Sequence, residues 1–157
     1  MSWLDSLLGH DQPSAKPART VLSQPSELSD FYPKILAGIC VYREARNESR
    51  EGKEAVWAVI WNRLVSGRWG TNLVSVITAP KQFSCFNPND LQVSLFPPPT
   101  DNRWLECLDV VWNMPPDLID GAMFYFNPNV VQPVWARAMI KVKSIGAHDF
   151  YKEQDHS

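Results

Sequence analysis

The 157-residue sequence is long enough to bury a substantial core as one compact domain. A hydrophobic fraction of 45% and a charged fraction of 20% are typical of a globular protein rather than a disordered or membrane-spanning one. The net charge of −2 gives no electrostatic basis for binding nucleic acid.

The first 30 residues are predicted to form a flexible N-terminal segment and linker, because residues 10–30 are rich in proline, serine and charge. The start, "MSWLDSLLGHDQ", has no basic region and only a short apolar run. We therefore expect the chain to be made in the cytoplasm without a signal peptide. Trp3, Leu4, Leu7 and Leu8 recur at helical spacing. We interpret them as a frayed terminus, and a peptide that docks on a partner or a membrane surface is the alternative.

The domain proper is predicted to span residues 31–157 and to begin with helices. Pro33 suits the first position of a helix that runs to about Asn47. Ser49 is a candidate cap for a second helix over residues 51–65, which the Ser66-Gly67 pair closes. Shorter helices are expected over residues 71–79 and 101–113, on either side of a long loop.

The C-terminal third changes to residues with β-propensity, in the segments 122–126, 136–145 and 148–152. Asn-Pro and Gly turn signals separate these segments. Helices followed by a small sheet predict an α+β domain that is predominantly helical, with a small C-terminal antiparallel sheet. The cysteines Cys40, Cys85 and Cys107 contain no CxxC pair, which argues against a disulfide framework and a zinc site.

Two glutamates stand out in "YREARNES", residues 42–49. On a helix, Glu44 shares a face with the apolar or small residues Ala37, Cys40 and Val41. Burial disfavours the charged form of a carboxyl group, and a protonated carboxyl at a cleft edge suits protonation of a leaving group. Glu48 extends the same face by one turn. The alternative is that both glutamates pair with Arg43, Arg46 or Arg50 on a solvated helix end.

The spacing of residues does not identify a second catalytic group. None of the other acids is singled out as a second catalytic carboxylate: Asp90, Asp101, Asp109, Asp117, Asp120 and Asp149. Tyr125 and Trp135 flank turns and are candidates for stacking on sugar rings, whereas Trp57 is expected in the core. His148, taken alone, is interpreted as structural.

Four separated blocks between residues 35 and 151 resemble the SleB-type cell-wall hydrolases, the spore-cortex-lytic family that also occurs in bacterial and phage lysins. The first is "YREARNESREGKEAVWAVIWNRL" (42–64), with the family's Glu-Ala-Arg-x-Glu element. The others are "VITAPKQFSCF" (76–86), "GAMFYFNPNVVQPVWAR" (121–137) and "KSIGAHDFY" (143–151). Asn47 stands where the family often has Gly, and Phe126 replaces a frequent Tyr.

The resemblance implies a lysozyme-like fold and a mechanism similar to that of lytic transglycosylases. It implies a glycosidase that cleaves the β-1,4 bond between N-acetylmuramic acid and N-acetylglucosamine of peptidoglycan, as a lytic transglycosylase or a muramidase (lysozyme), with no cofactor or metal. Glu44 matches the family's proton donor, and Glu48 is a supporting acid. The expected saccharide-binding residues are Gln82, Phe83, Tyr125, Asn127 and Trp135.

The expected partners are peptidoglycan glycan strands. An expected lack of a signal peptide favours a phage endolysin, released through a holin, or a virion-associated lysin attached through the N-terminal segment. The protein is expected to be a monomer. A non-catalytic peptidoglycan-binding or virion structural module is the alternative. An amidase or peptidase would usually need a zinc-binding set, which the sequence does not show.

Overall fold

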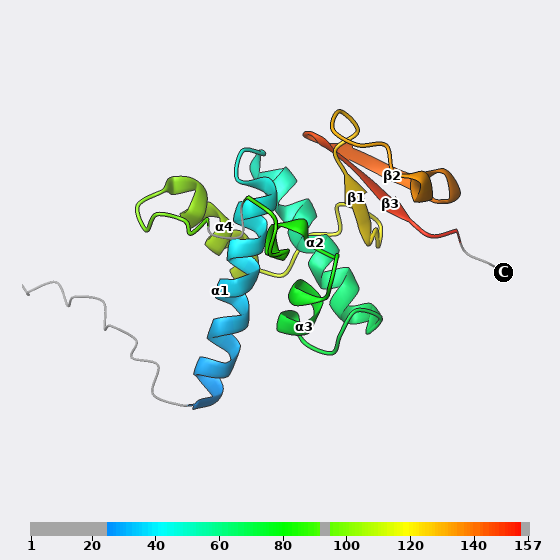
Figure 1. Ribbon diagram of the computed structural model, residues 1–157. Helices are drawn as coiled ribbons and strands as arrows, with labels where there is room; N and C mark the ends of the chain where they lie inside the picture. Colours follow the sequence, from blue (N-terminus) through cyan, green and yellow to red (C-terminus); the bar gives the residue numbers. More distant parts are fainter. Residues whose placement is uncertain (1–24, 92–94, 155–157) are drawn as a thin grey trace, which may run out of the picture.

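A computed structural model describes residues 25–91 and 95–154. Helices α1 (Pro25–Ala45), α2 (Arg50–Ser66), α3 (Leu73–Thr78) and α4 (Asn102–Trp112) form the larger part, and a sheet packs against one side of α2 (Figure 1). The strands are β1 (Phe124–Phe126), β2 (Ile140–Ile145) and β3 (His148–Lys152), and the 3₁₀ helices are η2 (Ser84–Phe86) and η3 (Val134–Ala138). The predicted α+β class with dominant helices is confirmed.

Helix α2 is the centre of the fold because it is buried on two sides. Trp57 and Ile60 contribute to the core that α2 shares with α1 and α4. Ala55 and Val59 contribute to a second core with Phe150 of the sheet. This explains why its sequence is apolar nearly all round. As predicted, the Ser49 side chain caps its N-terminus, and Gly67 ends it in the left-handed conformation.

Helix α1 is longer than predicted. It begins at Pro25, so residues 25–30, which the sequence assigned to the linker, are helical. Pro33 lies inside the helix rather than at its first position. An internal proline costs about 3 kcal/mol and one backbone hydrogen bond but does not forbid a helix around it. Residues 1–24, including the proposed docking residues Trp3 to Leu8, lie outside the described part of the chain, and the domain division stays a prediction.

The sheet is antiparallel with the order β1-β3-β2, so β3 lies in the middle. Asn62 of α2 donates a hydrogen bond to the carbonyl of Ala122 (2.9 Å), and Arg63 donates to that of Met123 (2.8 Å). These bonds fasten α2 to the chain that enters β1. All three cysteines are free and buried. None of the helices in the described ranges is both long and apolar enough to cross a bilayer.

A turn after α3 holds a lysine in a strained backbone conformation. The amide of Gln82 donates to the carbonyl of Ala79 (3.2 Å), which closes a turn whose central residues are Pro80 and Lys81. Lys81 has a φ of 64°. Proline followed by a residue of positive φ defines a type II turn, whose third position favours Gly or Asn. Lysine is therefore not the residue that the backbone prefers there.

We expect Lys81→Gly to stabilise the protein. Glycine removes a left-handed penalty of about 1 kcal/mol but adds unfolded-state entropy, so the free energy of unfolding should rise by about 0.5 kcal/mol. Urea denaturation measures the change. As a control, Lys143→Gly on strand β2 should lower stability, because glycine weakens a strand. A lower free energy of unfolding in Lys81→Gly would contradict the interpretation that the backbone at Lys81 is strained.

Candidate active site

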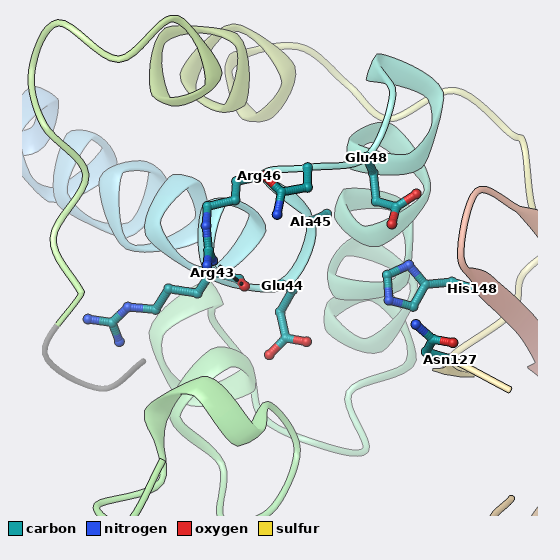
Figure 2. A pocket seen from close by; sticks show the side chains of 8 residues that line it. Arg43, Glu44, Ala45, Arg46, Glu48, Asn127 and His148 are labelled. Atoms are coloured by element: carbon teal, nitrogen blue, oxygen red, sulfur yellow. Dashed lines mark hydrogen bonds between the residues drawn. The ribbon is translucent and has the colours of Figure 1, made fainter. Parts of the chain in front are cut away.

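Glu44 is the penultimate residue of α1, where the helix emerges from the core. The residues before it on the same face, Ala37, Cys40 and Val41, are 0% exposed, as the sequence predicted. Glu44 itself is half-buried, and its side chain points toward the space between the helices and the sheet (Figure 2). The buried stripe therefore ends in a carboxyl group that lines a cavity.

The two oxygens of the Glu44 carboxyl group have different surroundings. Oε2 accepts a hydrogen bond from the Tyr125 hydroxyl (3.0 Å). Oε1 is buried and has no hydrogen-bond partner among the described residues. Burial, and then the charge of Glu44, raise the pKa of Tyr125 well above its usual value, so this hydroxyl remains a donor at neutral pH. A buried oxygen without a partner costs about 1–3 kcal/mol unless a water, a proton or a ligand satisfies it.

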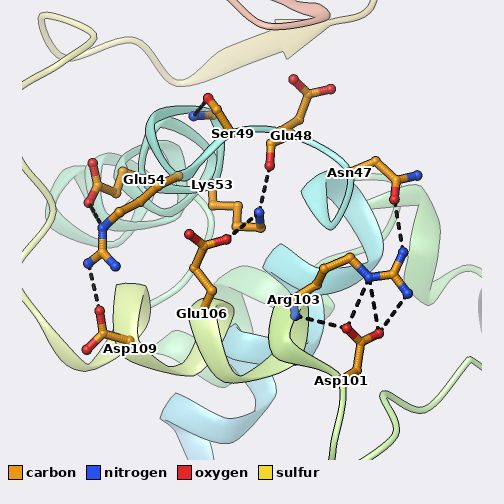
Figure 3. A network of polar contacts seen from close by, with 11 residues as sticks. Asn47, Glu48, Ser49, Lys53, Glu54, Asp101, Arg103, Glu106 and Asp109 are labelled. Atoms are coloured by element: carbon orange, nitrogen blue, oxygen red, sulfur yellow. Dashed lines mark hydrogen bonds and ion pairs between the residues drawn. The ribbon is translucent and has the colours of Figure 1, made fainter.

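The alternative that the glutamates pair with nearby arginines is wrong for the residues that the structure describes. Arg43 donates to the backbone carbonyls of Leu95 (3.1 Å) and Cys85 (3.0 Å). Arg50 pairs with Glu54 and Asp109 (Figure 3). Neither Glu44 nor Glu48 has an ion pair with an arginine in the described ranges.

Glu48 is held by a backbone amide at its carboxylate and by a lysine side chain at its backbone carbonyl. Its Oε2 accepts a hydrogen bond from the amide of Ala147 (3.1 Å), in the turn between β2 and β3. Gly146 has a φ of 58°, and a Cβ atom there would overlap Oε2 of Glu48. The carbonyl of Glu48 accepts from Lys53 Nζ (2.6 Å), which also pairs with Glu106 (Figure 3). Glu48 thus joins the α1–α2 connection to the sheet.

His148 lies between Glu48 and Asn127 and faces Glu44 across the cavity (Figure 2). Its ring contacts the Tyr125 ring edge-on at 5.2 Å between centroids. Nδ1 is buried and has no partner within the described ranges. Burial lowers the pKa of His148, and the charges of Glu48 and Glu44 oppose that shift only in part. The imidazole is therefore neutral at pH 7.

Two cavities meet at Glu44, Asn127 and His148. One, of about 220 Å³, is lined mainly by residues 43–48. The other, of about 450 Å³, extends toward Arg63, Lys81 and Gln82. Together they form a cleft that passes on both sides of Glu44. The cleft is lined by side chains from α1, α2, the turn after α3, and the sheet.

The structure brings most of the predicted saccharide-binding residues to this cleft. Gln82, Tyr125 and Asn127 line it, and Trp135, 37% exposed, lines an adjoining cavity. Phe83 does not fit the prediction, because it is 2% exposed and packs under the guanidinium of Arg63. A buried ring has no surface to offer a sugar. The resemblance placed Phe83 in the right segment but carried no information about which way its side chain points.

Sequence reasoning also missed residues of the site. His148 and Arg63 line the cleft, although spacing gave no reason to place either beside Glu44. The only available signal for His148 was its place in the Ile-Gly-x-His block. Arg63 is 5% exposed, and burial lowers its pKa from the usual arginine value. Both side chains come from elements distant in sequence from residues 42–49, and only the packed fold brings them together.

Comparison with known proteins identifies the family. Residues 47–151 match the family model described as cell wall hydrolase. The chain belongs to the cell wall hydrolase family. The matched range begins at Asn47, so it includes Glu48 but not Glu44. The assignment of Glu44 thus rests on its geometry and its motif.

Relatives of this chain include two spore cortex-lytic enzymes. That of Halalkalibacterium halodurans is 36% identical over 126 residues, which are 80% of this chain and 36% of the relative. That of Bacillus subtilis is 34% identical over 128 residues, 82% of this chain and 40% of the relative. The chain thus spans less than half the length of these two curated relatives.

Two solved structures are similar throughout the domain. The catalytic domain of the Bacillus cereus SleB protein is 32% identical, with a TM-score of 0.61, and the match covers 76% of this chain and 89% of that domain. The catalytic domain of the germination-specific lytic transglycosylase SleB from Bacillus anthracis is also 32% identical, with a TM-score of 0.62, over 76% of this chain and 93% of that domain. The lysozyme-like fold that the resemblance implied is confirmed.

We expect His148 to titrate below pH 6.5, its usual value, in the folded protein. An unfolded chain then binds more protons below that pH, so His148 makes the protein less stable as the pH falls through this range. NMR titration of the imidazole protons, assigned with His148→Gln, measures the pKa. Glu48→Gln removes a negative charge and should lower it further. A His148 pKa above 6.5 would show that the charges of Glu48 and Glu44 outweigh the effect of burial on this pKa.

Proposed function

We propose that this cell wall hydrolase cleaves the β-1,4 bond between N-acetylmuramic acid and N-acetylglucosamine in peptidoglycan, with Glu44 as the general acid. The observation that carries the proposal is the asymmetric environment of the Glu44 carboxyl group. Tyr125 holds Oε2, while Oε1 is buried beside the cleft without a partner. A protonated carboxyl in this position can give its proton to a glycosidic oxygen that enters the cleft.

Proton transfer from Glu44 to the glycosidic oxygen lets the bond between that oxygen and C1 of the muramyl residue break. The Glu44 carboxylate then faces the positive charge that develops at C1, and it takes a proton from the incoming nucleophile. In the lytic transglycosylase route the muramyl 6-hydroxyl attacks C1 and gives a 1,6-anhydro end. In the muramidase route water attacks and gives a reducing end. Both routes return Glu44 to its protonated state.

The neighbouring groups have supporting roles in this proposal. Tyr125 fixes the carboxyl group, and the neutral His148 and Asn127 are available for hydrogen bonds to the sugar. Glu48 supports the site through the turn at Ala147, since its Oε2 is engaged there. Gln82 and Trp135 extend the saccharide-binding surface away from Glu44.

The relatives are bacterial spore cortex-lytic enzymes, so these comparisons lend no support to the phage endolysin or virion-associated role. Holin-dependent release, attachment through the N-terminal segment and the monomeric state stay predictions. A non-catalytic peptidoglycan-binding module on the same fold is the competing function. We propose that the protein acts on the bacterial cell wall.

We expect Glu44→Gln to abolish cleavage, because the amide has no acidic proton to transfer. General acid catalysis typically contributes about 10²–10⁴-fold, and the rate should fall by at least that factor. Loss of turbidity of purified cell walls measures the rate, and circular dichroism checks the fold. Glu48→Gln is the matched control and should lose less than about tenfold, because its amide oxygen still accepts from Ala147. Full activity in Glu44→Gln would refute the assignment.

The same digests identify the reaction when their products are analysed by mass spectrometry. Anhydro-muramyl ends indicate the lytic transglycosylase route, and reducing muramic acid ends indicate hydrolysis by water. Binding to cell walls with no cleavage by the wild-type protein would favour the non-catalytic module. Release of free peptides without glycan cleavage would defeat the proposal.

Tyr125→Phe should lower kcat by about tenfold to a hundredfold with little change in KM. The substitution removes the hydrogen bond to Glu44, which becomes charged as it gives up its proton, and a hydrogen bond to a charged group is worth about 1.5–3 kcal/mol. It keeps the ring that packs on Phe150 and His148. Steady-state kinetics on soluble glycan fragments separate kcat from KM. A change confined to KM would show that Tyr125 binds substrate instead of positioning the acid.

A further inference from the structure

A cavity of about 270 Å³ branches from the cleft on the side away from Glu48. We call it the side pocket, and it is lined by Arg63, Lys81, Gln82, Phe124, Tyr125 and Trp135. Four of these residues also line the larger cavity that contains Glu44. A molecule bound in the cleft next to Glu44 therefore has direct access to the side pocket.

The side pocket is positively charged. Within the described part of the chain, Arg63 and Lys81 are its only charged lining residues. Arg63 bonds to the carbonyls of Met123 and Gln82 and packs on aromatic rings, but it has no ion pair with a carboxylate in the described ranges. Lys81 likewise forms no hydrogen bond or ion pair there. The charge of Glu44 acts on Arg63 from the adjoining cavity, so Lys81 is the cation that remains to attract an anionic ligand.

The backbone at Lys81 gives an independent reason to assign it a function. Its φ of 64° occupies the position of a type II turn where glycine would be unstrained. Backbone strain of this kind clusters at ligand-binding sites. Here the strained turn places Lys81 in the wall shared by the cleft and the side pocket.

We propose that the side pocket binds a carboxylate of the peptide stem carried by the glycan strand, with Lys81 as its ionic partner. The inference rests on the proposed cleavage of peptidoglycan. The sugar backbone of that polymer is uncharged, and its carboxylates belong to the peptide stems attached to muramic acid. A cationic branch beside the sugar cleft is where a stem next to the cleaved bond would lie. Phe124 and Trp135 cover the apolar part of the stem.

The test compares two forms of one substrate with three forms of the enzyme. Glycan strands that bear peptide stems are compared with the same strands after their stem carboxylates have been converted to neutral methyl amides. Lys81→Gly removes the cation without loss of stability, and Lys143→Ala removes a surface cation that pairs with Glu51. Lys81→Gly should lower kcat/KM about tenfold on strands with free stem carboxylates and less than about twofold on the amidated strands, since a tenfold loss corresponds to about 1.4 kcal/mol of binding. Lys143→Ala should change neither.

Direct binding separates this inference from the proposed function. A soluble muramyl peptide, titrated into the wild-type protein and followed by NMR, should perturb the amide signals of Lys81 and Gln82. Lys81→Gly should bind it at least about fivefold more weakly, and Lys81→Arg should retain binding. Unchanged binding in Lys81→Gly, or an equal loss of kcat/KM on both substrates, would overturn the inference. Absence of cleavage by the wild-type protein would refute the proposed function alone. The titration would still show whether the side pocket binds the muramyl peptide.

Discussion

The hydrogen bond from Tyr125 to Glu44 joins the two parts of this molecule at its candidate active site. Glu44 belongs to α1 and Tyr125 to β1, so the bond forms only when the sheet is correctly placed on α2. That placement depends on the two-sided burial of α2, whose residues contribute to both hydrophobic cores. Packing far from the cleft therefore determines the orientation of the proposed acid.

Buried cationic side chains fix the backbone segments that surround the cleft. Arg43, Lys53 and Arg63 are at most 5% exposed, and each donates to backbone carbonyls of an irregular segment. Arg43 holds the loop around Cys85 and Leu95, Lys53 holds the carbonyl of Glu48, and Arg63 holds the chain that enters β1. Carbonyl groups that would otherwise lack partners are satisfied by charge-assisted bonds. The irregular segments that carry site residues are thereby fixed without regular secondary structure.

The features that the sequence predicted well are local ones. Ser49 and Gly67 mark the ends of α2 because caps act within one turn of the helix. The stripe from Ala37 to Val41 follows from helical periodicity alone. The start of α1 was predicted wrongly at Pro33, because the sequence does not distinguish a proline at the first position of a helix from one inside it. Phe83 was assigned to the cleft because a motif names a residue but does not give its burial.

The parts of the site that could not be predicted are assembled from distant segments. The neutral state of His148 depends on burial by the packed sheet, and the side pocket combines residues 63, 81–82, 124–125 and 135. No spacing rule connects these positions. The two cavities of the cleft differ in charge: Arg43 and Arg46 balance Glu44 and Glu48 in the first, whereas Arg63 and Lys81 outnumber Glu44 in the second. An uncharged sugar is insensitive to this difference, whereas an anionic substituent is favoured toward the cavity that contains Lys81. The charge distribution therefore favours one orientation of a substituted strand over the reverse, independently of the contacts that any single sugar makes.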